Sequence, residues 1–167
     1  MIDMYDPPTV PTPVGGYSQA VAVRGPATLL YISGQIPETA SGSVPPDFDD
    51  QCRAVWANIV AILAAADMSI QHLVKVTTYL TRREDAARNG EIRQAVLGAH
   101  RPALTVIVAQ TLDPRWLLEI EAVAARDDAP KENQAARVAA EPLNAWDLDE
   151  DVPLEEIVVL PAAAVQV

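Results

Sequence analysis

Short runs of β-branched and apolar residues, bounded by glycine and proline, recur along the first 125 residues of this 167-residue chain. The runs cover residues 17–23, 28–36, 72–81, 103–110 and 117–124. Runs of this length and composition are typical of β-strands. Turn signals separate the first two runs (Gly25-Pro26) and the last two (Asp113-Pro114). The pattern therefore predicts two hairpins, one at each end of the folded region.

Two other stretches follow helical spacing. Apolar residues recur at i, i+4, i+7 and i+8 from Phe48 to near Met68, which is typical of an amphipathic helix. Thr81 and Glu84 have the spacing of a capping box, which predicts the start of a second helix, and Gly98 occupies a C-cap position at its end. The order strand, strand, helix, strand, helix, strand, strand predicts an α+β fold with two helices on one face of a sheet.

The second face of this sheet has no helix left to cover it. Strands that are apolar on both faces expose a large apolar surface unless something packs there. We therefore expect this face to meet another subunit, so the pattern alone predicts an oligomer.

The chain carries a formal net charge of -11, from 23 acidic and 12 basic residues. This charge repels phosphate backbones and anionic lipid, so neither nucleic acid nor a membrane surface is an expected partner. No apolar run approaches the roughly 20 residues of a membrane span, and the N-terminus lacks the pattern of a signal peptide. We expect a cytoplasmic protein.

The sequence contains no motif typical of a metal site or of a cofactor-binding site. Cys52 lies at an apolar position of the first predicted helix, which favours a buried core thiol. His72 and His100 have no cysteine or carboxylate at metal-ligand spacing and are expected at the surface or as caps. No Gly-rich phosphate loop is present. We expect neither a metal nor a cofactor.

The acidic charge is concentrated at the C-terminus. Residues 126–167 hold ten acidic and three basic residues, a net charge of -7. We divide the chain into a proline-rich lead-in (1–14), a folded domain (15–125) and an acidic extension (126–167). The extension ends in an apolar peptide (152–167), a layout typical of a segment that docks on another protein, such as a microcompartment shell. The peptide fits equally well as a segment that packs on its own oligomer.

Two carboxylates interrupt the last predicted strand. Side chains alternate across a strand, so Glu119 and Glu121 point to one face while Leu118 and Ile120 point to the other. A face with two carboxylates is either solvated or a site. In a catalytic role, a carboxylate there would orient a water for attack on a C=N carbon. In a structural role, it would pair with a basic residue of a neighbouring subunit and fix the register between the two subunits.

Several segments together resemble one family. GGYSQAV, YISGQIP, NIVAILAAADM, KVTTYL, RPALT and EIEAVA, in this order and spacing, are similar to the YjgF/RidA (Rid) family over about residues 15–125. The resemblance implies a chorismate-mutase-like fold and a homotrimer, in which three sheets form a central barrel and adjacent subunits form three clefts. Founding members hydrolyse reactive enamine and imine intermediates released by pyridoxal-phosphate enzymes, without metal or cofactor.

The resemblance also assigns roles to residues of this chain. Residues that match the small-molecule-binding positions of the cleft are Tyr17, Ser33, Gly34 and Asn89. Glu119 matches the carboxylate thought to position a water, which makes it the candidate catalytic residue.

The chain departs from the family where an arginine grips the substrate carboxylate, because that position is Leu104. Leucine supplies no donor, so the usual activity on 2-aminoacrylate is not expected. Arg101 lies three residues upstream, about 10 Å along a strand, and its side chain cannot simply take the vacant place. It either enters the cleft from the rim or from a neighbouring subunit, or pairs with an acid such as Asp113.

Two functions therefore stand at this stage. In the first, the protein is a Rid-type hydrolase acting on imines or enamines with non-standard specificity. In the second, it is a non-catalytic trimer that binds a small molecule or a protein, with the peptide 152–167 as its docking segment.

Overall fold

The computed structural model describes residues 1–13, 15–39 and 41–128. These residues belong to one unit of the chain, Met1–Pro130. From residue 129 onward the expected acidic extension (126–167) lies outside the described residues, and so does the peptide 152–167 with its expected docking role.

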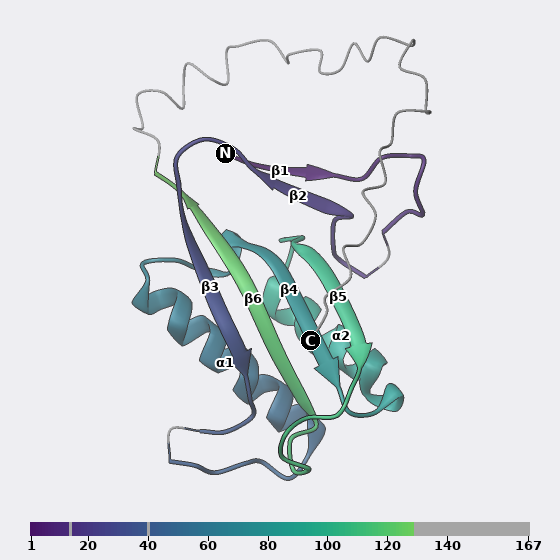
Figure 1. The fold of residues 1–167 in the computed structure, drawn as a ribbon. Coiled ribbons are helices and arrows are strands. Elements are labelled where there is room, and N and C mark those ends of the chain that lie inside the picture. Colours follow the sequence, from purple (N-terminus) through teal and green to yellow (C-terminus); the bar gives the residue numbers. More distant parts are fainter. Residues whose placement is uncertain (14, 40, 129–167) are drawn as a thin grey trace, which may run out of the picture. The chain divides into compact units, whose positions relative to one another are not determined.

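The described elements follow the predicted order, with one strand added in front (Figure 1). They are β1 (Ile2–Tyr5), β2 (Ala20–Val23), β3 (Ala27–Gln35), α1 (Phe48–Ala65), η1 (Ile70–His72), β4 (Leu73–Leu80), η2 (Arg83–Asp85), α2 (Ala86–Leu97), β5 (Ala103–Val108) and β6 (Leu118–Asp127). The two η elements are short 3₁₀ turns that precede β4 and α2.

Four strands form one mixed sheet in the order β3-β6-β4-β5. β6 runs antiparallel to both β3 and β4, while β5 runs parallel to β4. Figure 1 shows α1 and α2 on the same face of this sheet. The predicted α+β fold with two helices on one face is confirmed.

The predicted hairpin at 101–124 is wrong, because β4 lies between β5 and β6. The connection 109–117 crosses the end of β4, where Ala109 N donates to Leu80 O (2.8 Å) and Thr81 N donates to Leu117 O (3.0 Å). Neighbouring strands lie about 4.8 Å apart, so a connection of this length easily passes over one strand. The Asp-Pro turn is only one part of that longer connection.

The predicted hairpin of the first two strands is also wrong, because β2 pairs with β1. The proline-rich composition of residues 1–14 gives no sign of a strand there. The predicted strand 17–23 is divided, since Ser18 bridges to Ala103 at the edge of β5 and only Ala20–Val23 pairs with β1. This division places Tyr17 beside β5.

The two helices start and end for local reasons. Asp47 caps α1 by accepting a hydrogen bond from Asp50 N at 3.0 Å. The capping box predicted at Thr81 is not formed, because the Thr81 hydroxyl donates to Leu117 O (3.1 Å). η2 therefore precedes α2, which begins at Ala86. The predicted C-cap is confirmed, since Gly98 has a φ of 59° and its N–H donates to Gln94 O.

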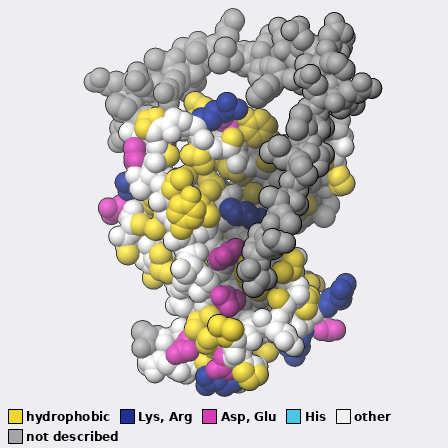
Figure 2. Space-filling model, in the orientation of Figure 1, with side chains coloured by type: hydrophobic (Ala, Val, Ile, Leu, Met, Phe, Trp, Pro, Cys, Tyr) yellow, Lys and Arg dark blue, Asp and Glu magenta, His cyan; other side chains and the backbone are white. Residues whose placement is uncertain are grey.

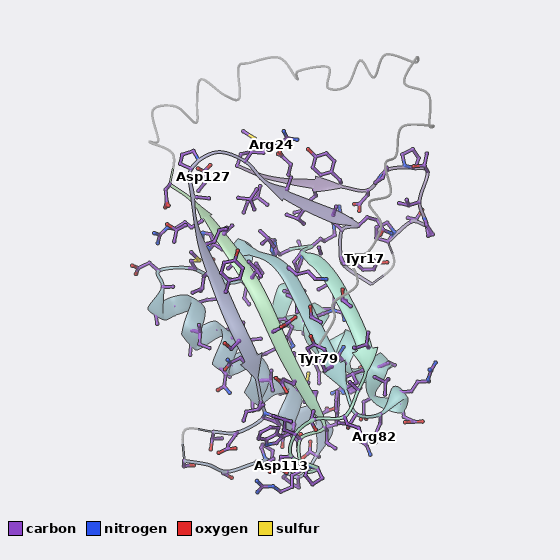
Figure 3. All side chains as sticks on the ribbon, in the orientation of Figure 1. Tyr17, Arg24, Tyr79, Arg82, Asp113 and Asp127 are labelled. Carbon is purple, nitrogen blue, oxygen red and sulfur yellow. The ribbon has the colours of Figure 1, made fainter. Side chains whose placement is uncertain are left out.

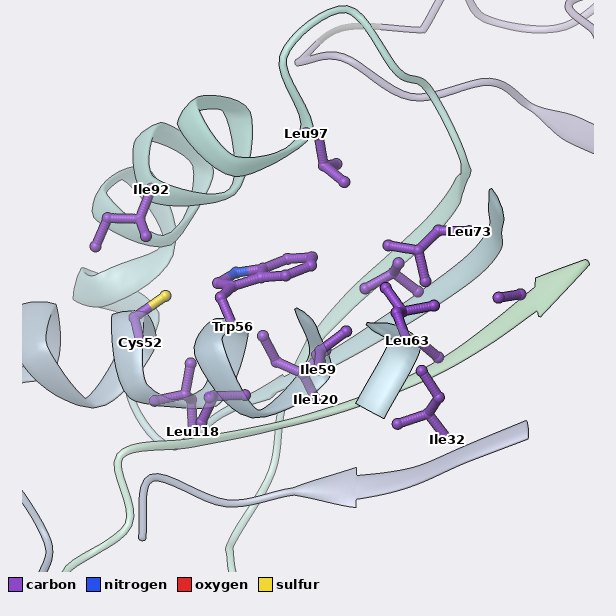
Figure 4. Packing of buried hydrophobic residues seen from close by; sticks show 14 of the residues in the cluster. Ile32, Cys52, Trp56, Ile59, Leu63, Leu73, Ile92, Leu97, Leu118 and Ile120 are labelled. Carbon is purple, nitrogen blue, oxygen red and sulfur yellow. The ribbon is translucent and has the colours of Figure 1, made fainter. Parts of the chain in front are cut away.

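The core lies between the helices and the sheet. Figure 4 shows Trp56, Ile59 and Leu63 of α1 packing beside Leu118 and Ile120 of β6, and all of them are buried. Burying such side chains stabilises a fold by about 1.5–3 kcal/mol each. The prediction that one face of β6 is apolar is confirmed.

The opposite face of the sheet has no helix over it. Figure 2 views this face and shows hydrophobic side chains gathered over β3. Exposed large apolar residues include Leu29 and Tyr31 on β3 and Ile107 on β5, with Tyr31 74% exposed. The open face expected from the pattern is therefore present in the described part of the chain.

Gln51 on α1 joins the helix to two loops. Its Nε2 donates to Pro45 O (2.8 Å) and to Arg115 O (2.9 Å), while its Oε1 accepts from Leu117 N (2.8 Å). The residue is 1% exposed. One buried amide thus satisfies three backbone groups, one of them at the entry to β6.

Replacing Gln51 with leucine should lower the free energy of unfolding by about 2–4 kcal/mol, because buried backbone groups left without partners cost about 1–3 kcal/mol each. Urea denaturation followed by circular dichroism measures this loss. Val60→Ala is the matched control on the exposed side of α1 and should change stability by less than about 1 kcal/mol. Equal stability of the two variants would contradict the role given to Gln51.

Candidate functional site

Glu119 lies against the backbone of β3. A Cβ built on Gly34 would meet Glu119 Oε1 at 1.8 Å, so a side chain at position 34 would force this carboxylate to move. The β3–β6 register shifts between Ile32 and Gln35, where Gly34 lies. A glycine inside a strand commonly marks a bulge or a close approach by another group, and both are present at Gly34. Ser33 precedes Gly34 and is exposed.

Glu121 has a structural partner on the same face of the sheet. The Tyr79 hydroxyl donates to Glu121 Oε1 at 3.2 Å. Desolvation and, after it, this hydrogen bond raise the pKa of the Tyr79 phenol. The two carboxylates of β6 thus differ, because one is engaged by a tyrosine while the other faces a glycine on the neighbouring strand.

A separate hollow of about 270 Å³ lies at the β5 edge of the sheet. Tyr17, Arg93, Leu104 and Val106 line it. Tyr17 reaches this place through the bridge that its neighbour Ser18 makes to Ala103 (Figure 3). Leu104 and Val106 point toward it together, because residues two apart on a strand share a face. We call these four residues the arginine hollow.

Arg93 has no signal in the pattern except its position, four residues after Asn89 and so on the same face of α2. It is 8% exposed and Asn89 is 1% exposed. Arg93 Nη2 donates to Gly15 O at 3.2 Å, and burial lowers the pKa of the guanidinium. Among the described residues, neither Arg93 Nε nor Asn89 Nδ2 has a hydrogen-bond acceptor.

Within one chain, the arginine hollow and Glu119 lie on opposite faces of the sheet. Leu104 pairs with Val76, whose side chain is fully buried on the helix side. Glu119 pairs with Tyr79, which stands three residues further along β4. Alternation along β4 then puts Glu119 on the open face. The structure therefore groups Tyr17 with Leu104, and Gly34 with Glu119, but does not bring the two groups together in one chain.

Arg101 lies outside both groups. Its guanidinium is 3.8 Å from the Asp6 carboxylate. The pairing expected with Asp113 is wrong, because Asp113 pairs with Arg115 at 2.7 Å. The partner is instead an acid of the N-terminal segment.

The two histidines have structural roles. His72 Nδ1 accepts a hydrogen bond from Ser69 N (2.9 Å), and His100 Nε2 donates to Leu73 O (2.7 Å). Within residues 1–13, 15–39 and 41–128, no group of three or more His, Cys, Asp or Glu side chains is placed to hold a metal ion. None of the helices described there has the length and apolarity needed to cross a membrane.

Comparison with known proteins gives a consistent match. The family model described as Endoribonuclease L-PSP matches residues 8–126. A RutC family protein of Pyrococcus horikoshii is 39% identical over 119 residues, which is 70% of this chain and 92% of that protein. The Escherichia coli protein named "Putative reactive intermediate deaminase TdcF" is 32% identical over 120 residues, 70% of this chain and 91% of its own.

Solved structures agree with these matches. YyfB of Yersinia pestis, a member of the conserved Rid protein family, superposes with a TM-score of 0.67 at 30% identity, covering 75% of this chain and 98% of its own. The structure of E. coli TdcF with bound serine superposes with a TM-score of 0.57 at 29% identity, covering 75% and 99%.

Cys52 is a core thiol, as predicted. It is fully buried, and burial raises its pKa to about 12. The folded protein therefore holds the neutral thiol, while an unfolded thiol ionises near pH 8.5. Stability that depends on this group is present below that pH and is lost as the pH rises toward 12.

Between about pH 9 and pH 10.5 the free energy of unfolding should fall relative to Cys52→Ala by on the order of 2 kcal/mol. Urea denaturation of both proteins across this range measures the difference and cancels the titration of other groups. Parallel curves for the two proteins would show that the thiol is not held neutral by the fold.

Proposed function

This chain belongs to the YjgF/RidA (Rid) family, and on that premise we propose that it hydrolyses reactive imines or enamines in a cleft shared by two subunits of a homotrimer. The observation that carries the proposal is the Glu119 carboxylate held against Gly34 on the open face of the sheet. A relative that matches most of the chain has a name that refers to reactive intermediate deamination.

The reaction needs one group that handles a water proton. Glu119 orients a water, whose oxygen forms a bond to the imine carbon while the C=N electron pair moves to nitrogen. The carboxylate accepts the water proton and passes it to nitrogen. The carbinolamine then passes its hydroxyl proton to nitrogen and breaks its C–N bond, releasing ammonia and leaving a carbonyl compound. An enamine first takes up a proton at carbon and loses one from nitrogen, which makes it the imine.

Two features of the single chain support the proposed homotrimer. The sheet exposes Leu29, Tyr31 and Ile107 on its open face, and burying such a surface against other copies removes it from water. The predicted cleft residues are also divided between two faces of one chain. In the proposed trimer, the arginine hollow of one subunit lies near Glu119 of its neighbour, and the two together form the cleft.

A non-catalytic binding trimer is the second candidate. Leu104 favours it, because this position offers no donor to a substrate. Ribonuclease activity, which the description of the family model names, is not proposed. The net charge of -11 repels an RNA backbone.

Two imines generated in situ test the proposal, one with a carboxylate made by an amino-acid oxidase and one neutral made by an amine oxidase. Their decay, followed through trapping by semicarbazide, should accelerate when the protein is added. Glu119→Gln should reduce the acceleration by about 10²–10⁴-fold, the usual contribution of a positioned acid or base. Glu121→Gln is the matched control on the same strand and face. No acceleration of either imine would remove the enzymatic proposal and favour the binding trimer.

Sedimentation velocity tests the assembly separately. The wild-type chain should sediment as a trimer, and Tyr31→Asp should shift it toward monomer because a charge then lies on the open face. Val60→Asp, on the exposed side of α1, should leave the trimer intact. A trimer that survives Tyr31→Asp unchanged would show that subunits meet elsewhere.

A further inference from the structure

Arg93 is a buried cation without an anionic partner in the described part of the chain. It forms no ion pair with any acid of the described residues, although the full sequence has 23 acidic residues against 12 basic ones. Exposed arginines do find acids, as Arg88 does with Asp49 and Arg115 with Asp113. A buried charge that lacks a partner costs several kcal/mol. An anion that is not part of the described chain would supply the missing partner.

The surroundings of Arg93 define the space that is open to such an anion. The guanidinium shares the arginine hollow with Tyr17, Leu104 and Val106. Its Nη2 is held by Gly15 O, while Nε is buried and without an acceptor. An arginine presents its N–H groups as a planar fork, so fixing one edge leaves another for a carboxylate. The volume of about 270 Å³ suits a molecule of a few heavy atoms.

Asn89 adds a second unused donor. Its Nδ2 has no acceptor among the described residues, and it lies one helical turn before Arg93. Side chains four apart on a helix stand about 5–6 Å from each other. Of these two buried donors, only Arg93 lines the arginine hollow, whereas Asn89 lies deeper, with its Oδ1 accepting from the buried Cys52 thiol.

We propose that Arg93, reaching from α2, binds the carboxylate of a small 2-imino or 2-oxo acid in the arginine hollow. The guanidinium that Leu104 does not supply from β5 thus comes from the facing helix, since Arg93 and Leu104 line the same hollow. This assignment rests on the proposed function and names its substrate class. It replaces the expectation, based on Leu104 alone, that carboxylate substrates are not recognised.

Binding of pyruvate to the full chain tests the assignment, with pyruvamide as the neutral analogue of the same shape. Titration calorimetry or ligand-observed NMR should show that pyruvate binds and that pyruvamide binds about 10- to 100-fold more weakly, the range expected for a charge-assisted pair. Arg93→Met should weaken pyruvate to the level of pyruvamide. Arg88→Met, an exposed arginine of the same helix that is paired with Asp49, should leave pyruvate binding unchanged.

A relocation variant tests the geometry. Arg93→Met combined with Leu104→Arg should restore the preference for pyruvate, because it returns a guanidinium to the hollow from the strand. If Arg93→Met does not fold, Leu104→Glu serves instead, since it leaves Arg93 in place and fills the hollow with an internal carboxylate. It should abolish pyruvate binding.

Four results would overturn the assignment: equal affinity for pyruvate and pyruvamide, no binding of pyruvate, unchanged pyruvate binding by Arg93→Met, or normal pyruvate binding by Leu104→Glu. No binding would indicate that Arg93 meets a carboxylate of another subunit or of the chain beyond residue 128. Failure of the hydrolase proposal is distinct, because it shows as absent imine turnover while pyruvate still binds through Arg93. Turnover that is equal for both imines and insensitive to Arg93→Met would instead retain hydrolysis and remove the anion site.

Discussion

The buried amide of Gln51 is the constraint on which the arrangement of the sheet depends. It holds the carbonyls of Pro45 and Arg115 and the N–H of Leu117, so the loop before α1 and the loop before β6 meet on one helix. Leu117 in turn receives two hydrogen bonds from Thr81 at the end of β4. These contacts keep the connection 109–117 over the end of β4. β6 therefore enters the sheet between β3 and β4 and places Glu119 two residues after the anchored position.

Beyond Leu117, successive side chains of β6 point alternately to the core and to the open face of the sheet. Leu118 and Ile120 go to the core, and Glu119 goes to the other face. The bulge of β3 then brings Gly34 against the carboxylate. A side chain at position 34 would displace the Glu119 carboxylate, so the position of this carboxylate depends on the glycine. The side chain of Glu119 is held by backbone on one side and stays open to the uncovered face on the other.

Much of this fold could be predicted from the sequence, because apolar spacing is a local property. It correctly predicted the long helix from Phe48, the strand ending near Leu80 and the buried face of β6. Strand pairing could not be predicted in the same way. The order of β5 and β6 depends on hydrogen bonds between Gln51 and residues more than 60 positions away, which no turn signal near Asp113 reveals.

The candidate site was predictable to a similar extent. The position of Glu119 on the face opposite the core follows from alternation, and Gly34 was named through its match to a cleft position of the family. Arg93 was not predictable, because an arginine on a helix is usually solvated, whereas this one is buried and donates to Gly15 O of the N-terminal segment. Its spacing of four from Asn89 was the one available signal.

One turn of backbone positions both ends of the arginine hollow. Gly15 has a φ of 87°, a conformation that side chains disfavour, and in it the Gly15 carbonyl accepts from Arg93 Nη2. The same turn leads, two residues later, into Tyr17, whose place is fixed by the bridge from Ser18 to β5. The guanidinium and the phenol are therefore set by a single connection rather than by the strand that carries Leu104. A charge can serve a site from any backbone that brings it to the right place, because electrostatic attraction depends on distance and burial and not on which element carries the group.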